Sequence, residues 1–216
     1  MTQLLDTLGQ PHVQLLLRLV LGGLLLLAGI TKLADRTAFR RAVVEYELLP
    51  TALERPFATI LPLLETVLGT LLLLGLGTSV AAALATPLFL SFGVAIGVNL
   101  LRGRQFDCHC FGAVRSDRIG WPALLRSVAL VLAALVVAAG ASRFGALESA
   151  LFGATEALPP VGEVIPIVLV AAVAFHALIL LPEAVAFRAG FARAYRSRIS
   201  GAHPATGHAV EARRSA

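Results

Sequence analysis

Long apolar stretches separated by short polar segments dominate the chain. Five of them approach the roughly 20 residues that a helix needs to cross a hydrocarbon core about 30 Å thick. They cover residues 13–34, 57–77, 79–101, 122–141 and 164–182. The pattern therefore predicts an all-α fold, a polytopic membrane helical bundle with four core transmembrane helices plus a fifth.

The composition agrees with this pattern. Hydrophobic residues make up 57% of the chain, charged residues make up 14%, and the mean hydropathy is +0.83, which a soluble globular domain does not reach. The first apolar run is longer than the hydrophobic region of a signal peptide, and no A-x-A cleavage pattern follows it, so we expect a retained helix. We expect residues 1–183 to form the membrane-embedded domain, and residues 184–216 to form an amphipathic interfacial helix followed by a disordered basic tail.

Positively charged residues flank the predicted spans unevenly. They gather around the loop after the first span, the loop after the third span and the C-terminal segment, whereas the connecting loops on the other side contain only Arg143. The positive-inside rule then predicts a multi-pass protein of the inner (plasma) membrane, with the N-terminus outside and the C-terminus in the cytoplasm. Because orientation accounts for the net charge of +5, we expect a lipid bilayer and not nucleic acid as the partner surface.

Shorter features refine this arrangement. Arg18 lies near the outer end of the first span, where its long side chain can reach the lipid headgroups. Residues 35–46 have the pattern of a short amphipathic helix at the membrane surface, and Pro50 is expected to end it. Gly93 and Gly97 have the small-xxx-small spacing that allows close helix approach in lipid.

Four polar residues fall in the cytoplasmic half of the predicted bundle: Glu65, Asn99, Arg126 and His176. Glu65 lies roughly 12 Å from the cytoplasmic end of its helix, where a carboxylate is costly and is usually turned towards a partner. It could pair with Arg126 in a purely structural ion pair, or it could handle protons beside a redox centre. His176 by itself is more typical of a hydrogen-bonded polar residue between helices than of a ligand.

Both cysteines of the chain, Cys108 and Cys110, lie in the predicted loop after the third span. A disulfide between positions i and i+2 is strained and easily reduced, which suits exchange better than stabilisation. Arginines in the same loop favour the reactive thiolate. Two alternatives are metal binding by Cys108, His109 and Cys110, one donor short of a closed zinc site, and two ordinary small residues without chemistry.

The redox interpretation requires an acceptor outside the chain. A single thiol pair provides no internal relay, so electrons must pass to a partner protein or directly to a quinone, the one cofactor we consider. The sequence contains no nucleotide-binding glycine loop, paired-histidine zinc motif or serine-nucleophile context. A thiol-disulfide oxidoreductase component is therefore the candidate enzyme class.

Several short motifs together resemble the MauE methylamine-utilisation family, a relative of the DoxX-like redox-associated membrane proteins. In chain order they are Gly29-Ile30-Thr31-Lys32-Leu33, Tyr46-Glu47-Leu48-Leu49-Pro50, Leu61-Pro62-Leu63-Leu64-Glu65, Cys108-His109-Cys110-Phe111-Gly112 and Ile119-Gly120-Trp121 with Arg126. The resemblance covers about residues 12–140 and is weaker in the fifth span and the tail.

The resemblance implies a membrane protein needed to process or mature the small subunit of methylamine dehydrogenase, a secreted protein. It implies disulfide formation with a thioredoxin-like partner, with Cys108 and Cys110 as the redox pair and Glu65 as the intramembrane acid. Arg126, Asn99, His109 and His176 would then support the site. That maturation is periplasmic, whereas the charge distribution predicts a cytoplasmic cysteine loop. The alternative function is a non-catalytic membrane scaffold or a metal-binding membrane protein.

Overall fold

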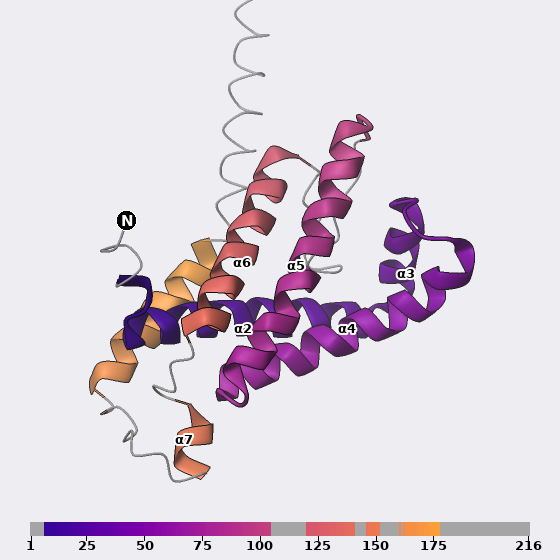
Figure 1. Cartoon of the computed structure of the whole chain (residues 1–216). Coiled ribbons are helices and arrows are strands. Elements are labelled where there is room, and N and C mark those ends of the chain that lie inside the picture. The colour runs from indigo at the N-terminus through magenta and orange to yellow at the C-terminus, as the bar shows by residue number, and fades with distance from the viewer. Residues whose placement is uncertain (1–6, 105–119, 141–145, 152–159, 161, 178–216) are drawn as a thin grey trace, which may run out of the picture. The chain divides into compact units, whose positions relative to one another are not determined.

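The structure is a computed structural model that describes residues 7–104, 120–140, 146–151, 160 and 162–177. All of these belong to the first of the two units into which the chain divides, residues 1–179 and 180–216. Helices are the regular elements of this described part, and it contains no strand (Figure 1). The predicted domain boundary after residue 183, the amphipathic segment and the basic tail lie outside the described residues.

Four of the described helices are long and apolar enough to cross a membrane. They are α2 (Pro11–Ala34), α4 (Thr51–Leu74), α5 (Thr78–Leu101) and α6 (Trp121–Gly140). A shorter apolar helix, Gly162–Ala177, occupies most of the predicted fifth span, whose last residues lie outside the described part. The predicted fold class is therefore confirmed, and the chain is a multi-pass helical membrane protein.

The spans pack as two close pairs. Helix α2 packs mainly against α4 and α5 mainly against α6, while α2 also contacts α6 and α4 contacts α5. The core between them is apolar and includes Leu21, Leu25, Leu72 and Ala134, each at most 1% exposed. The helix Gly162–Ala177 lies against α2, where Phe175 approaches Gly23 and His12 Nε2 lies 3.5 Å from Glu163 Oε2.

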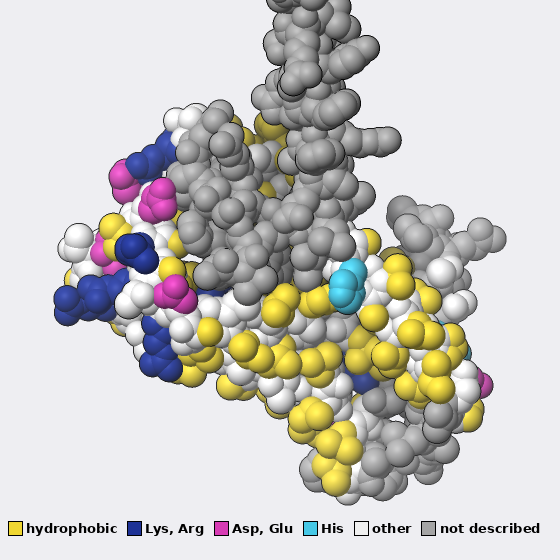
Figure 2. All heavy atoms as spheres, turned by 180° about the vertical axis from the view of Figure 1, so that it is seen from behind, with side chains coloured by type: hydrophobic (Ala, Val, Ile, Leu, Met, Phe, Trp, Pro, Cys, Tyr) yellow, Lys and Arg dark blue, Asp and Glu magenta, His cyan; other side chains and the backbone are white. Residues whose placement is uncertain are grey.

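Apolar side chains also cover much of the outside of the spans. Val67 of α4, Val80 of α5 and Leu132 of α6 are each more than half exposed. Figure 2 shows hydrophobic side chains spread over one face of the molecule, with charged side chains gathered at the end where α3 lies. Outward-facing apolar side chains are what a helix needs where lipid takes the place of water.

Two glycines allow α2 and α4 to approach closely. A Cβ atom on Gly29 would overlap the hydroxyl oxygen of Thr66 and would lie 2.8 Å from the carbonyl oxygen of Pro62. A Cβ atom on Gly69 would lie 2.6 Å from the backbone nitrogen of Leu26. Since real Cβ contacts do not reach these distances, the two backbones can lie this close only if both positions are glycine.

The predicted small-xxx-small pair, Gly93 and Gly97, lies on the face of α5 that meets α6. Here a Cβ atom would lie 3.4 Å from Ser127 Cβ and 3.8 Å from Leu124 Cδ1, respectively. The pair therefore lies at a helix contact, as expected, but the tighter approach is that of α2 and α4.

Helix α3 (Arg36–Glu45) is the predicted short amphipathic helix. The carboxylate of Asp35 caps it by accepting hydrogen bonds from the Ala38 N–H at 2.9 Å and the Thr37 hydroxyl at 2.8 Å, and these bonds lower the pKa of Asp35. The apolar face of α3 packs on α4, with Phe39 against Leu61 among the contacts of this cluster.

The expected stop of this helix at Pro50 is wrong. Helix α3 ends at Glu45, and Glu47 then adopts a left-handed conformation with φ of 48°, which turns the chain before the proline. Pro50 instead precedes α4 as its N-cap. The turn at residues 46–49 therefore joins α3 to α4 and does not continue the helix.

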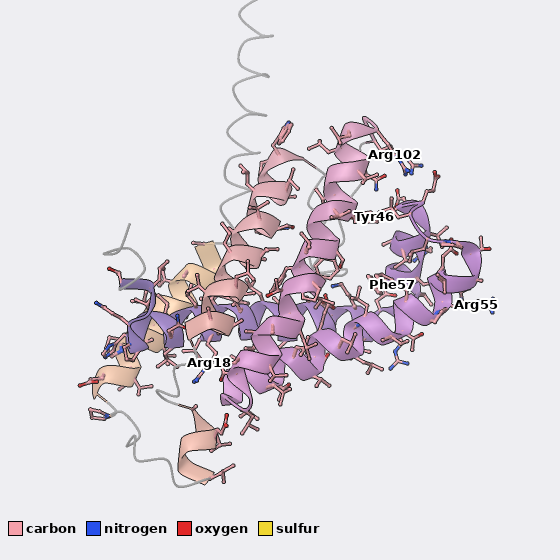
Figure 3. All side chains as sticks on the ribbon, viewed as in Figure 1. Arg18, Tyr46, Arg55, Phe57 and Arg102 are labelled. Carbon is pink, nitrogen blue, oxygen red and sulfur yellow. The ribbon has the colours of Figure 1, made fainter. Side chains whose placement is uncertain are left out.

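Arg18 differs from its prediction as well. Its side chain is 2% exposed, so the protein and not the lipid headgroups surrounds it. One guanidinium nitrogen, Nη1, lies close to Gly75, the left-handed C-cap residue of α4, and Ala146 contacts the same glycine. Figure 3 shows Arg18 beside the turn that joins α4 to α5. Arg18 thus belongs to the interior of the bundle.

Candidate functional site, a buried ion pair

A buried ion pair joins α2 to α4. Lys32, in the last turn of α2, places Nζ 2.5 Å from Oε1 of Glu65. The two side chains are 1% and 0% exposed. The close contact between Gly29 and Pro62 lies about one turn away on each helix and brings the two side chains together. Two charges this deep in a membrane span are tolerated because each neutralises the other.

Aromatic rings surround the ammonium group. Lys32 Nζ lies 5.3 Å from the ring centre of Phe39 in α3 and 5.1 Å from that of Phe92 in α5. Both distances are in the range of cation–π attraction. An ammonium group has three N–H donors, and within the described residues Glu65 is the hydrogen-bond acceptor for one of them. Lys32 therefore connects α2, α3, α4 and α5 at one point.

Only one of the two carboxylate oxygens of Glu65 accepts a hydrogen bond from a described residue. Its second oxygen, Oε2, is buried and has no hydrogen-bond partner among the described residues. Glu65 also lines a cavity of about 30 Å³ together with Arg126 and Ser127 of α6. An unpaired buried oxygen is uncommon in stable proteins, and a redox or catalytic role is one of its explanations.

The expected partner of Glu65 was wrong. The cation at ion-pair distance is Lys32, and Arg126 lines the same small cavity as Glu65. Lys32 is one of the basic residues around the loop after the first span, which the positive-inside rule counts as orientation signals. The residue spacing along α2 indicates that Lys32 is buried, because Lys32 continues the buried stripe formed by Leu21, Leu25 and Ala28.

Asn99, near the end of α5, is fully buried. Its side-chain amide donates to the carbonyl oxygens of Ala95 at 3.1 Å and Tyr46 at 3.3 Å, and its Oδ1 atom has no partner in the part of the chain that the structure describes. Asn99 therefore holds the α3–α4 turn against α5. Burial raises the pKa of Tyr46, so its phenol stays protonated near neutral pH.

His176 does not join the other polar residues. It is exposed, its Nδ1 lies 2.7 Å from the Ala172 carbonyl oxygen, and its ring meets Phe175 edge-on at 5.7 Å. In its helix the buried residue is Ala171, and His176 lies on a different face. The predicted depth of His176 carried no information about which face it occupies.

Cys108, His109 and Cys110 lie outside the described residues, but both ends of their segment are fixed. Before it, Arg104 Nη2 lies 2.6 Å from Oε1 of Glu47, in the turn after α3. After it, Ala123 of α6 packs in one cluster with Tyr46 and with Ile96 of α5. The chain therefore leaves and re-enters the bundle beside the α3–α4 turn.

Fold and site together define a class, a multi-pass helical membrane protein with a buried lysine–glutamate pair between two of its spans. Residues 10–140 match the family model described as "Methylamine utilisation protein MauE". The chain belongs to the MauE family. The matched region includes all four long helices, the ion pair and the cysteine segment.

Individual relatives agree with the family match. The chain is 35% identical to the methylamine utilization protein MauE of Paracoccus denitrificans over 62% of this chain and 73% of that protein. It is 40% identical to the protein of the same name from Methylophilus methylotrophus, over 60% of this chain and 69% of the relative. For Methylorubrum extorquens the identity is 37%, over 61% and 71%. No solved structure matches the chain significantly.

Proposed function

We propose that this MauE-family protein serves methylamine utilisation as a membrane-embedded component of thiol–disulfide exchange, with Cys108 and Cys110 as its redox pair. Its partner is a thioredoxin-like protein, and the final target is the secreted small subunit of methylamine dehydrogenase. The family match over residues 10–140 is the observation that carries the proposal, because it spans both the cysteines and the buried ion pair.

The chemistry requires two reaction partners. Oxidation of two thiols to a disulfide releases two electrons and two protons, and the disulfide is passed on by attack of a partner thiolate through a mixed disulfide. With one cysteine pair in the chain, each cycle must both deliver a disulfide and regain one. The buried Glu65 carboxylate, with its second oxygen unpaired, is the group we assign to proton handling, and Lys32 positions it.

We further propose the inner membrane as the location, with the N-terminus outside and the cysteine segment on the cytoplasmic side, so that the protein takes part in electron transfer from the inside and does not contact the secreted subunit directly. Exposed arginines gather on and beside α3, at the end of the bundle where the cysteine segment begins; they are Arg36, Arg40, Arg41 and Arg55. Figure 2 shows this concentration of basic side chains. Positive charge of this kind is retained on the cytoplasmic side during insertion.

Changing either cysteine should stop the exchange. Cys108→Ser and Cys110→Ser should each reduce the fraction of correctly disulfide-bonded dehydrogenase small subunit by about tenfold or more, because one thiol cannot form the intramolecular disulfide. The measurement is mass spectrometry of differentially alkylated small subunit from cells grown on methylamine. Ser116→Ala, a substitution in the same segment, is the control and should leave the fraction unchanged.

The amount of each variant in the membrane must be measured in the same cells. If both cysteine variants reach normal levels and still support full disulfide formation, the exchange function is excluded and a non-catalytic scaffold is the better account. If zinc or copper copurifies with the wild-type protein and is lost in both variants, the cysteines bind metal instead.

A further inference from the structure

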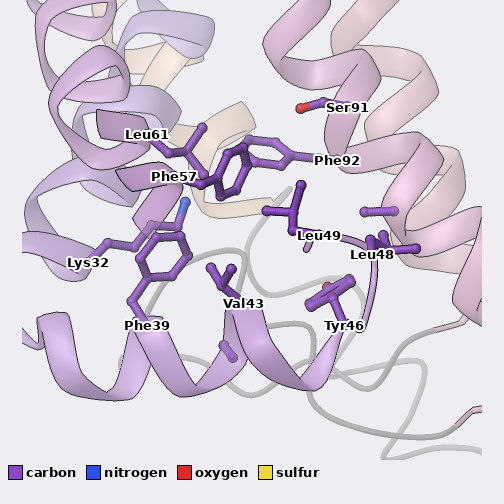
Figure 4. Close-up of a pocket in the computed structure, with 12 residues that line it drawn as sticks. Lys32, Phe39, Val43, Tyr46, Leu48, Leu49, Phe57, Leu61, Ser91 and Phe92 are labelled. Atoms are coloured by element: carbon purple, nitrogen blue, oxygen red, sulfur yellow. The ribbon is translucent and has the colours of Figure 1, made fainter. Parts of the chain in front are cut away.

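A second feature lies beside the ion pair, a cavity of about 200 Å³ enclosed by α3, the α3–α4 turn, α4 and α5. Its walls are mostly apolar and include the aromatic side chains of Phe39, Tyr46, Phe57 and Phe92, and the side chain of Lys32 reaches it from α2 (Figure 4). Nothing in the thiol chemistry described above uses this space. An apolar cavity of roughly 150 Å³ is enough to hold benzene, so a substituted six-membered ring fits here.

The charges at this cavity select a neutral ligand. Lys32 and Glu65 already neutralise each other, so an anionic ligand would add uncompensated negative charge next to a buried carboxylate. The ammonium group nevertheless has donors left, because Glu65 accepts only one hydrogen bond from it among the described residues. A neutral molecule with a carbonyl oxygen satisfies both conditions, since it accepts a charge-assisted hydrogen bond without bringing charge.

A second cavity continues the first. It has a volume of about 530 Å³, lies between α4 and α5, and shares Leu49, Phe57, Leu61 and Ser91 with the ring-sized cavity. Its other walls are aliphatic, and two of them, Ile60 and Leu84, are more than half exposed on the outer surface of the spans. The polar side chain in this lining, Ser91, donates its hydroxyl to the Leu88 carbonyl oxygen at 2.7 Å, so a long apolar chain can extend from the first cavity to the lipid along largely apolar walls.

We infer that these two cavities bind an isoprenoid quinone, with the ring beside Phe57 and Phe92, a ring carbonyl accepting a hydrogen bond from Lys32, and the tail between α4 and α5. A fatty acid or phospholipid has the required tail but brings an anion to the ion pair. A hydrocarbon or simple terpene has no acceptor for the ammonium donors. Tyr46 lies in the wall of the same cavity.

Binding of the quinone is inferred from the cavities alone, whereas its use as electron acceptor rests on the proposed thiol function. In that use, two cysteine thiols lose two electrons and two protons and form the disulfide, and the quinone takes up both electrons and both protons to become the quinol. The reaction then supplies the disulfide that each exchange cycle removes. Glu65 does not line this cavity, but its Oε1 lies 2.5 Å from Nζ of Lys32, which does, so the ion pair connects the ring site to the carboxylate assigned to proton handling.

Binding can be tested with the purified full chain in lipid nanodiscs. Decylubiquinone and a short-chain menaquinone are titrated separately, and the dissociation constant is obtained by equilibrium dialysis. Saturable binding of at least one quinone is expected. Ala95→Phe, which puts a ring into the cavity from α5, should weaken it by about tenfold or more, while Ala83→Phe, the same change at an exposed position of α5, should leave it unchanged.

A second variant covers the case in which Ala95→Phe disturbs folding. Lys32→Met/Glu65→Leu removes both charges together and should weaken quinone binding by about tenfold through loss of the donor. The inference is overturned if neither quinone binds saturably, if the two phenylalanine variants bind equally well, or if oleate displaces the quinone at equal concentration. The Cys108→Ser/Cys110→Ser variant should bind normally, so quinone binding and thiol exchange can fail separately.

Discussion

Replacing Lys32 by methionine should lower the free energy of unfolding by about 3–5 kcal/mol, because Glu65 would keep a buried carboxylate without a counter-ion. The pair is less exposed than any other in the described part of the chain, at 1% and 0%. The same change also removes the cation between the rings of Phe39 and Phe92. Reversible unfolding in mixed detergent micelles, followed by circular dichroism, measures the effect.

The control for this variant is an exposed pair. Arg104 and Glu47 lie 2.6 Å apart, but their side chains are 31% and 65% exposed, so Arg104→Met should change stability by about 1 kcal/mol at most. The double variant Lys32→Met/Glu65→Leu should recover a large part of the loss, since no buried charge remains. Equal stability of the wild type and Lys32→Met would mean that the ion pair does not hold α2 and α4 together.

Adding a single methyl group at Gly69 should destabilise the protein by about 1–3 kcal/mol, because a Cβ atom there would lie 2.6 Å from the backbone nitrogen of Leu26. Backbone atoms cannot rotate away as the end of a side chain can. Gly69→Ala must therefore push α2 and α4 apart, and the ion pair one turn beyond Gly29 should be strained with them. The same unfolding assay measures the change.

Gly97→Ala is the matched control for Gly69→Ala. At this position of α5 a Cβ atom would meet Leu124 Cδ1 at 3.8 Å, an ordinary contact. Because alanine reduces the freedom of the unfolded chain, this variant should match or exceed the wild type by up to about 1 kcal/mol. If the two alanine variants lose stability equally, helix propensity or lipid contact decides the outcome, and the close approach of α2 and α4 does not.

The membrane spans could be predicted from the sequence because their length and apolarity are local properties. Residues 13–34 and 79–101 were expected as helices, and the structure has Pro11–Ala34 and Thr78–Leu101. The inward position of Glu65 was also predictable, since an ionised group facing lipid is too costly. The start of α4 at Thr51 was missed because Glu54, Arg55 and Pro56 interrupt the apolar pattern within its first two turns.

What the sequence did not reveal is the direction in which each side chain points. Depth along a helix placed Glu65, Arg126 and His176 at one level, but level does not specify the helix face. The periodicity of α2 did contain that information: Arg18, Leu21, Leu25, Ala28 and Lys32 follow the spacing of one helical face, and all five are buried. Reading the two cations as part of this stripe would have predicted that both are buried.

The pairing of α2 with α4 could not have been derived from either helix alone. It depends on Gly29 and Gly69 meeting backbone atoms of the other helix, a property of both surfaces together. The cavity beside Lys32 likewise depends on the turn after α3. In this turn Glu47 has a positive φ, which its residue type does not predict. The close α2–α4 contact and the cavity beside Lys32 both depend on how separate elements pack together. The ion pair and the proposed ligand site lie at these two places.

The most direct test of the account is the redox state of Cys108 and Cys110 in cells grown on methylamine. Acid-quenched protein is alkylated with a mass-tagged maleimide, with and without prior reduction, and a membrane-impermeant reagent applied to intact and permeabilised cells reports the side. We predict that a fraction of the protein gains two tags only after reduction, and that this fraction is absent from Cys110→Ser. We also predict that the impermeant reagent reaches the thiols only in permeabilised cells. If both thiols are fully tagged before reduction, with no gain afterwards, the pair does not cycle and the proposed exchange is contradicted.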